Sequence, residues 1–405
     1  MASSTGATAK DLQSAQLLQL YETFPYPRTI GDLQRFRDGQ QQPVWNPKSS
    51  FPVFFPEAKF RRDLDILVAG CGTNLAPVFA ATMPEARVVG VDISGASLEL
   101  SEALARENGI HNLEHHQLPL EEIETLGRKF DYVCCTGVIH HLSDPAAGLR
   151  ALGSVLHPDG AMMIMVYARY GRQGIYMLQE LSRMLGLSIC ETDAAKVQKL
   201  LTLLPERHPF RLVYERESRP ISLEEVMDMV LNPRDVSYRV ADIRTLVDDA
   251  GLAFHRWLGN AEYRPEFTSL SGAGLDLAPS LLDPWARAAA AELAHGTLLK
   301  HRFVLTHPHR ASAEDLFAGS RIADAYPSLS GHIHVEHVGQ NLVVTNEAHQ
   351  VPVKIAAPVQ DIGPLLKTAD GTRTVGDLVE AGGSKGHEVF RRLYHADIIQ
   401  LSLTK

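Results

Sequence analysis

Ile66-Leu67-Val68-Ala69-Gly70-Cys71-Gly72-Thr73-Asn74 is the stretch that decides the fold of this 405-residue chain. Four apolar residues typical of a buried strand lead directly into a glycine-rich turn, and the pattern beyond it predicts a helix near residues 76–81. Glycines let a ligand approach such a turn closely, and the start of the helix offers free N–H groups. A dinucleotide-binding turn of the Gly-x-Gly-x-x-Gly type needs glycine at position 75, where this chain has Leu75, so a pyrophosphate ligand is disfavoured.

A carboxylate stands at the end of the next strand that the pattern predicts. Asp92, in Val88-Val89-Gly90-Val91-Asp92-Ile93, lies 20 residues beyond Gly72. A carboxylate at such a strand end can accept hydrogen bonds from both hydroxyls of a ribose. Because no phosphate-binding feature accompanies it, the two motifs predict a site for a nucleoside without phosphates. The alternative is a plain strand–turn–helix unit that binds no ligand.

Short apolar runs continue to alternate with helical patterns as far as residue 167. Strands separated by helices are typical of βαβ units, so we predict an α/β fold with a doubly wound, Rossmann-like, mostly parallel sheet. Residues 168–247 have Leu, Met and Val at helical spacing, and residues 252–258 and 301–306 are expected to close the sheet as an antiparallel pair. The earlier strands are expected at residues 66–69, 88–91, 131–135 and 161–167.

The composition narrows the class of protein. The chain is 45% hydrophobic and 21% charged with a net charge of -9, so the basic surface typical of nucleic-acid-binding proteins is absent overall. Four cysteines, two of them adjacent, form neither a disulfide framework nor a zinc-binding pattern. The first ten residues lack the apolar segment of a secretory signal, and the longest apolar runs are far shorter than the ~20 residues that span a bilayer. A cytoplasmic location is therefore expected.

Two further motifs follow in order along the chain, Phe130-Asp131-Tyr132-Val133-Cys134-Cys135-Thr136-Gly137-Val138-Ile139-His140-His141-Leu142 and Leu156-His157-Pro158-Asp159-Gly160-Ala161. Together with Ala69–Asn74 and Gly90–Ser94, they resemble the class I S-adenosylmethionine-dependent methyltransferases. The likeness covers roughly residues 65–170 and, more loosely, the strands up to residue 306. It implies an enzyme that binds S-adenosylmethionine, transfers its methyl group and releases S-adenosylhomocysteine.

The resemblance also implies which residues hold the cofactor. Gly70 and Gly72 would pass beneath the methionine part, Asp92 would hold the ribose, and Ile93 would lie on the adenine. The complete set that it implies is Gly70, Cys71, Gly72, Thr73, Asn74, Asp92, Ile93, Gln117, Leu118, Thr136, Gly137 and Val138.

Two positions depart from the family pattern. Val68 stands where the family often has an acid, which would weaken the hold on the cofactor's amino group. Asn74 replaces a third glycine, a milder change because asparagine also tolerates positive φ.

The segment Tyr21-Glu22-Thr23-Phe24-Pro25-Tyr26-Pro27 resembles an N-terminal motif of a methyltransferase subgroup with a C-terminal module, including, distantly, the rickettsial-type protein-lysine methyltransferases. We interpret residues 1–62 as an N-terminal arm or lid, since tyrosine faces suit a sulfonium cation and closing aromatics exclude water. Residues 63–308 are expected to form the methyltransferase domain, with a helical insertion at about 168–247. Residues 309–405 are expected to form a small, winged-helix-like α+β accessory domain for regulation, substrate binding or dimerisation, the last of which would make a homodimer.

Transfer to an amine or a hydroxyl requires a base that takes the proton. His140 and His141 follow the fourth strand and are the candidates for this role, with Tyr21 and Tyr26 as alternatives. Capping or packing is the other interpretation of the two histidines. Three more histidines within residues 111–116 have no acid at ligand spacing, so no metal site is expected.

Candidate substrate contacts follow the fifth strand, at the rim where open α/β sheets bind ligands. Arginines and tyrosines there would suit an anionic or planar substrate, and we favour contact with the substrate or lid over the alternative of a solvated loop with aromatic anchors. The candidates are Tyr167, Arg169, Tyr170, Arg172 and Tyr176.

The methyl acceptor itself is not specified by these motifs. Net acidity argues against nucleic acid, while a protein or peptide and a small molecule with an N, O or S nucleophile both stay open. A competing interpretation is a non-catalytic regulatory protein that binds S-adenosylmethionine or S-adenosylhomocysteine and signals through residues 309–405. The departures at Val68 and Asn74 keep this interpretation open. A dehydrogenase is disfavoured by Leu75.

Overall fold

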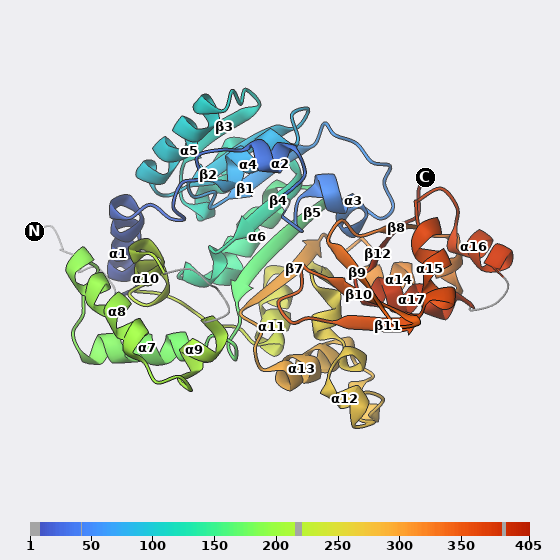
Figure 1. Cartoon of the computed structure of the whole chain (residues 1–405). Coiled ribbons are helices and arrows are strands. Elements are labelled where there is room, and N and C mark those ends of the chain that lie inside the picture. The colour runs from blue at the N-terminus through green and yellow to red at the C-terminus, as the bar shows by residue number, and fades with distance from the viewer. Residues whose placement is uncertain (1–8, 42, 215–220, 383–385) are drawn as a thin grey trace, which may run out of the picture.

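A seven-stranded sheet forms the centre of the computed structural model, which describes residues 9–41, 43–214, 221–382 and 386–405 (Figure 1). The strand order is β3-β2-β1-β4-β5-β7-β6, with β1 to β5 running parallel, β7 antiparallel to β5, and β6 antiparallel to β7. This confirms the doubly wound sheet and its antiparallel closing pair. The strands are β1 Asp65–Ala69, β2 Arg87–Asp92, β3 Leu113–Gln117, β4 Phe130–Thr136, β5 Leu156–Tyr167, β6 Ala253–Trp257 and β7 Lys300–Thr306.

Both faces of this sheet are buried, which explains why its inner strands are almost wholly apolar. Leu67 and Ala69 of β1 enter one core, whereas Ile66 and Val68 enter the core on the opposite face. The first core is covered by α6 Pro145–Val155, α11 Val240–Ala250 and α13 Pro284–His295, and the second by α3 Pro47–Phe54, α4 Leu75–Thr82 and α5 Gly95–Glu107.

The edge strand β3 is absent from the strands that the sequence predicts. Its residues, Leu-Glu-His-His-Gln, are polar and mostly half-buried or exposed, so they lack the apolar run that marks the inner strands. Pairing with β2 holds the strand in place instead.

The N-terminal arm comprises α1 Ala9–Thr23, α2 Gln34–Arg37 and α3. Helix α3 contains two prolines, Pro47 and Pro52. Pro47 stands in the first turn, where proline is tolerated, and the helix kinks at Ser50, whose φ is -135°, just before Pro52. Two short helical pieces therefore accommodate both prolines.

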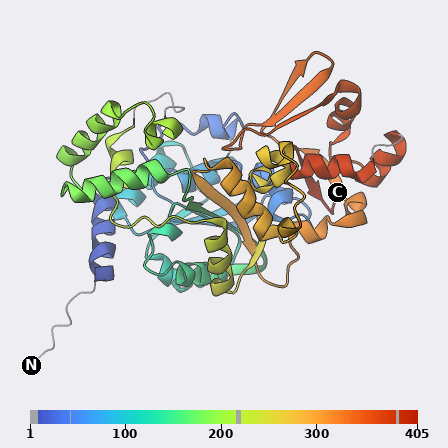
Figure 2. The same cartoon turned by 90° about the horizontal axis from the view of Figure 1, so that it is seen from below.

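The helices of residues 173–229 gather beside α1 at one end of the molecule, away from the C-terminal region (Figures 1 and 2). They share an apolar core with Leu20 of α1. These helices are α7 Gln173–Met184, α8 Glu191–Leu203, α9 Pro209–Tyr214 and α10 Leu223–Met229.

Residues beyond β7 form an α+β region with its own apolar core (Figure 2). Helices α16 and α17 precede strand β12, which pairs with β8. The winged-helix likeness and the boundaries at residues 62/63 and 308/309 stay predictions. The elements are α14 Ala313–Leu316, β8 Tyr326–Leu329, β9 Ile333–Val338, β10 Asn341–Asn346, β11 Lys354–Pro358, α15 Val359–Thr368, α16 Val375–Gly382, α17 Gly386–His395 and β12 Ile399–Ser402.

Short helical turns complete the described chain: α12 Ser269–Gly272 and the 3-10 turns Leu120–Leu126, Ile139–His141, Asn260–Tyr263, Pro265–Phe267, Pro279–Leu281 and Gly319–Asp324. Within the described residues, no helix is both long enough and apolar enough to cross a membrane. The first eight residues, over which the sequence predicts no secretory signal, lie outside the described range.

Buried His255 of β6 predicts a loss of stability in acid. Burial, with Arg310 and Arg256 nearby, lowers its pKa to about 3, so it stays neutral in the folded protein. Below pH ~6.5 the unfolded chain takes up a proton here that the folded chain does not, so folding free energy is lost, by up to about 1.4 kcal/mol per pH unit, as the pH falls toward 3. His255→Asn keeps a donor for the carbonyl of Ala311, which Nδ1 reaches at 3.2 Å, and cannot titrate.

Urea unfolding at pH 7.5 and 5.5 measures this contribution. The loss of stability between the two pH values should be smaller in His255→Asn than in the native protein by about 1.4 kcal/mol. Equal losses would show that His255 does not carry the acid sensitivity.

Candidate cofactor and acceptor site

A cavity of about 440 Å³ lies at the carboxyl ends of β1, β2 and β4, the edge at which open α/β sheets bind ligands. The glycine-rich turn after β1 forms one wall, and the N-terminal arm forms another. Its lining includes Tyr21, Tyr26, Trp45, Gly70, Gly72, Asn74, Asp92, Ile93, Leu118, Glu121, Thr136, Val138, His141, Tyr167, Asp228 and Lys300.

The two glycines of the turn are required by its geometry. Gly70 and Gly72 have φ angles of +68° and +53°, in the left-handed region that favours glycine. A Cβ atom on Gly70 would lie 2.0 Å from Cγ2 of Val138, and one on Gly72 would lie 2.7 Å from the carbonyl oxygen of Tyr26. We call this turn, which packs at close range against Val138 and the arm, the glycine cradle.

Asp92 connects the end of β2 to this turn. Its Oδ2 accepts a hydrogen bond of 2.8 Å from the N–H of Gly72, and its Oδ1 accepts one of 3.0 Å from the N–H of Ser94. Burial raises the pKa of Asp92, and these N–H groups oppose the rise. Each carboxylate oxygen keeps a second lone pair, so the group can also accept hydrogen bonds from vicinal hydroxyls of a ribose.

Most residues of the predicted cofactor set line the cavity, and two do not. Thr73 points to the arm and donates its hydroxyl hydrogen to the carbonyl of Pro27. The exposed Gln117 donates from Nε2 to the carbonyl of Ile93 at 3.1 Å, so the adjacent Leu118 faces the cavity in its place.

Asn74 has a role that the sequence alone does not reveal. Its Oδ1 accepts from the N–H of Ile30 at 3.1 Å, and its Nδ2 donates to the carbonyl of Arg28 at 3.0 Å. On the other side of the cavity, Glu22 accepts the N–H of Gly95 at the start of α5 at 2.6 Å. The side chain that replaces a third glycine thus holds the arm closed over the turn.

A carboxylate from the helical insertion enters the same cavity. Asp228 of α10 is buried, and its Oδ1 accepts the hydroxyl hydrogen of Tyr21 at 2.8 Å while its Oδ2 accepts that of Tyr167 at 3.3 Å. Burial and the neighbouring Asp228 raise the pKa of both tyrosines well above 10, so both hydroxyls keep their protons and act as donors. Sequence reasoning missed Asp228; its one signal is a lone acid among the apolar residues Val226–Val230.

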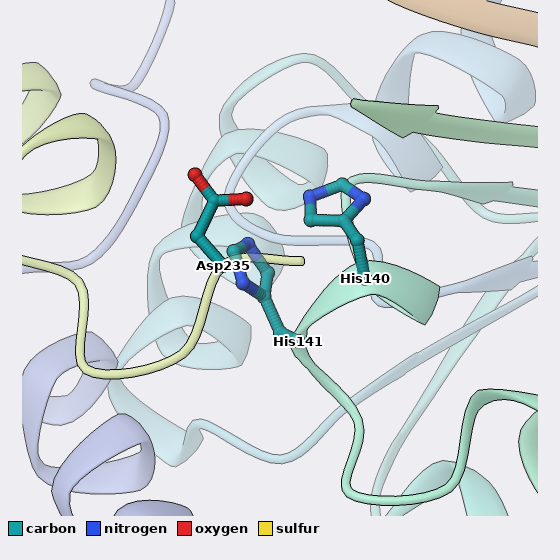
Figure 3. A group of neighbouring side chains, drawn as sticks. All are labelled: His140, His141 and Asp235. Atoms are coloured by element: carbon teal, nitrogen blue, oxygen red, sulfur yellow. The ribbon is translucent and has the colours of Figure 1, made fainter. Parts of the chain in front are cut away.

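The adjacent histidines have different environments (Figure 3). His141 lines the cavity, and its Nδ1 lies 2.5 Å from the carbonyl of Arg234, so Nδ1 carries the hydrogen and Nε2 keeps a lone pair. His140 is fully buried against Tyr167, with ring centroids 3.9 Å apart, and neither ring nitrogen has a partner within the described residues. Burial, helped by His141 and Arg172, lowers the pKa of His140 well below 6.5 and keeps it neutral.

Asp235 approaches both histidines, and one ligand atom from each of the three lies within 4.8 Å of the others (Figure 3). Such a group has the residue types of a metal site. However, Oδ2 of Asp235 already accepts from Arg172 at 3.1 Å and from Gln179 at 3.0 Å. A divalent cation would lie beside the buried Arg172 guanidinium, so we assign these residues no metal.

Of the five predicted substrate residues, one lines the cavity and the other four do not. Tyr167 lines the cavity, and Arg172 lies behind it, with its guanidinium 3.4 Å from the ring centre. Tyr176 donates to the carbonyl of Ala168 at 3.4 Å. Arg169 is exposed and Tyr170 half-buried, and neither lines the cavity. The phenol of Tyr26, a predicted catalytic alternative, is in the lining.

The strand order and the glycine-rich turn after β1 are those of a doubly wound α/β protein with a ligand-sized cavity at its strand ends. Residues 61–206 match the family model described as a methyltransferase domain. An uncharacterized protein of Synechococcus sp. is 28% identical over 74% of this chain and 73% of its own length. The ubiquinone biosynthesis O-methyltransferase of Neisseria meningitidis is 32% identical over 24% of this chain and 40% of its own.

The fold is shared with a solved structure over nearly the whole chain. PKMT2 from Rickettsia typhi superposes with a TM-score of 0.63 at 16% identity, covering 94% of this chain and 78% of that one. The structure of PKMT2 in complex with AdoHcy superposes with a TM-score of 0.62 at 15% identity, again covering 94% of this chain and 78% of that one. The chain carries a methyltransferase domain in residues 61–206. It is an enzyme whose cofactor is S-adenosylmethionine.

Proposed function

We propose that the enzyme methylates a primary amine of the lysine type on a polypeptide. The observation that carries this proposal is the buried carboxylate of Asp228, held by two tyrosine hydroxyls in the cavity that also contains Asp92. Three acidic residues, Asp92, Glu121 and Asp228, line this cavity. Lys300 is the only Lys or Arg among the described lining residues. An excess of negative charge favours an acceptor that arrives as a cation.

The glycine cradle and the carboxylate of Asp92 fit the cofactor, since all three residues line the cavity and the carboxylate oxygens can accept hydrogen bonds from ribose hydroxyls. When bound there, S-adenosylmethionine supplies an electrophilic methyl group on a sulfonium. The arm covers the turn through Asn74 and excludes water from the site.

Asp228 is proposed to attract and orient the acceptor ammonium between the rings of Tyr21 and Tyr167. An amine attacks only as the neutral base, so one proton must leave first. Nε2 of His141 has a lone pair and no partner within the described residues, and His141 lines the cavity, which makes it our candidate base. His140 is enclosed, and Tyr21 keeps its own proton, so both are weaker candidates.

In this scheme the nitrogen lone pair forms a bond to the methyl carbon while the carbon–sulfur bond breaks. The sulfur keeps the electron pair, and the methylated amine carries the positive charge away. The catalytic contribution of the chain is then orientation and desolvation, together with removal of one proton. We propose that residues 63–308 carry this chemistry, with residues 1–62 as the lid.

Transfer from methyl-labelled S-adenosylmethionine to a panel of acceptors tests the proposal. We expect label on a lysine-containing peptide and none on the same peptide with its lysine acetylated, because acetylation removes both the charge and the nucleophilic lone pair. Phenol and thiol acceptors of similar size should react far more slowly. Label on a phenol or a thiol but not on the lysine peptide would overturn the proposal.

A further inference from the structure

A second cavity, of about 980 Å³, lies beside the cofactor cavity and shares α1 with it as a wall. It is bordered by α1, α7, the segment 187–191 before α8, and the segment 230–235 after α10. We call it the α1–α7 groove. Its volume is at the upper end of the range for ligand sites and exceeds that of the cofactor cavity.

Side-chain amides and hydroxyls dominate the polar lining of the α1–α7 groove. Gln13, Gln16, Gln179, Ser182, Ser188 and Asn232 are among them. These groups can donate and accept hydrogen bonds, so they match the alternating N–H and C=O groups of an extended peptide. Arg183 is the only Lys or Arg in the described lining, which disfavours a phosphate backbone.

One layer of side chains separates this groove from the cofactor cavity. On α1, Leu20 faces the groove while Tyr21 faces the cavity. Nδ2 of Asn232, from the groove, lies 3.4 Å from the hydroxyl oxygen of Tyr21, which is itself bound to Asp228. This hydrogen bond closes the wall between the groove and the cofactor cavity at the point where Tyr21 is bound to Asp228.

We propose that the α1–α7 groove binds the extended main chain of the polypeptide acceptor, and that the acceptor's lysine side chain displaces the hydrogen bond between Asn232 and Tyr21 to reach Asp228. This inference rests on the proposed function and adds the surface that selects a polypeptide. The long, unbranched, four-carbon stem of lysine suits an acceptor that must reach across a wall one side chain thick. A free amine without flanking residues uses the cavity but not the groove.

Steady-state kinetics with Gln16→Trp test the inference. Gln16 is exposed and lines the groove, so a tryptophan there fills the groove without entering the cofactor cavity. We expect the KM for a lysine peptide to rise by roughly tenfold or more, with an unchanged Kd for S-adenosylhomocysteine and an unchanged rate on a single blocked lysine. Leu18→Trp is the matched control, because Leu18 is exposed on the same helix and lines neither cavity.

Peptide length gives a second, independent measurement on the native enzyme. The KM should fall as residues are added on both sides of the lysine. A KM that does not change with length, or equal KM values for Gln16→Trp and Leu18→Trp, would overturn the groove assignment while leaving amine methylation intact. No methylation of any lysine substrate by the native enzyme would instead overturn the proposed function.

Discussion

Asp228→Asn is expected to lower kcat for a lysine peptide by about 100-fold, the scale of losing a charge-stabilising group from a closed active site. The substitution keeps the shape of the side chain and one acceptor oxygen, but it removes the negative charge toward which the acceptor ammonium is drawn. Both hydroxyl donors, Tyr21 and Tyr167, stay in place. Rates under saturating cofactor, with the Kd of S-adenosylhomocysteine measured in parallel, give the result.

Tyr21→Phe is the control for Asp228→Asn. It removes one hydrogen bond to the carboxylate while keeping the ring and the charge, so its rate should fall by less than that of Asp228→Asn. An effect on cofactor binding alone would assign Asp228 a different role. If Asp228→Asn weakens cofactor binding and leaves the acceptor kinetics unchanged, Asp228 holds the cofactor's amino group, in place of the acid that the family often has where this chain has Val68.

Asp92→Ala is expected to weaken cofactor binding by about 1.5–3 kcal/mol, or roughly ten- to a hundredfold in Kd. The substitution removes the acceptors proposed for the ribose hydroxyls. It also frees the N–H groups of Gly72 and Ser94, so the turn loses its connection to the end of β2. Calorimetric titration with S-adenosylhomocysteine measures the change, and NAD serves as the ligand that should not bind.

Asp92→Asn separates the two contributions. Its amide oxygen can still accept from one N–H group, so its Kd should lie between those of the native enzyme and of Asp92→Ala. An unchanged Kd in Asp92→Ala would mean that the ribose is held by other residues. A Kd for Asp92→Asn equal to that of Asp92→Ala would assign the whole effect to the carboxylate's second oxygen and its charge.

The sequence by itself determines the central sheet and the cofactor turn, because both depend on local patterns. Apolar residues on both faces of β1 require a strand that is buried on both sides. The positive φ angles of Gly70 and Gly72 make glycine necessary at those positions, so the turn can be predicted from the sequence alone. The polar edge strand β3 is not predicted in this way, because it has no apolar pattern and is held by hydrogen bonds to β2.

Only the tertiary structure decides which distant side chains meet in the site. Tyr21 and Asp228 are 207 positions apart, and packing of α1 against the helical insertion brings them together. His140 and His141 have the same residue type and adjacent positions, yet the turn at Ile139–His141 places one against Tyr167 and the other on the cavity wall. A local pattern determines the element to which a residue belongs. The packing of whole cores against one another determines what that residue touches, and no short stretch of sequence contains that information.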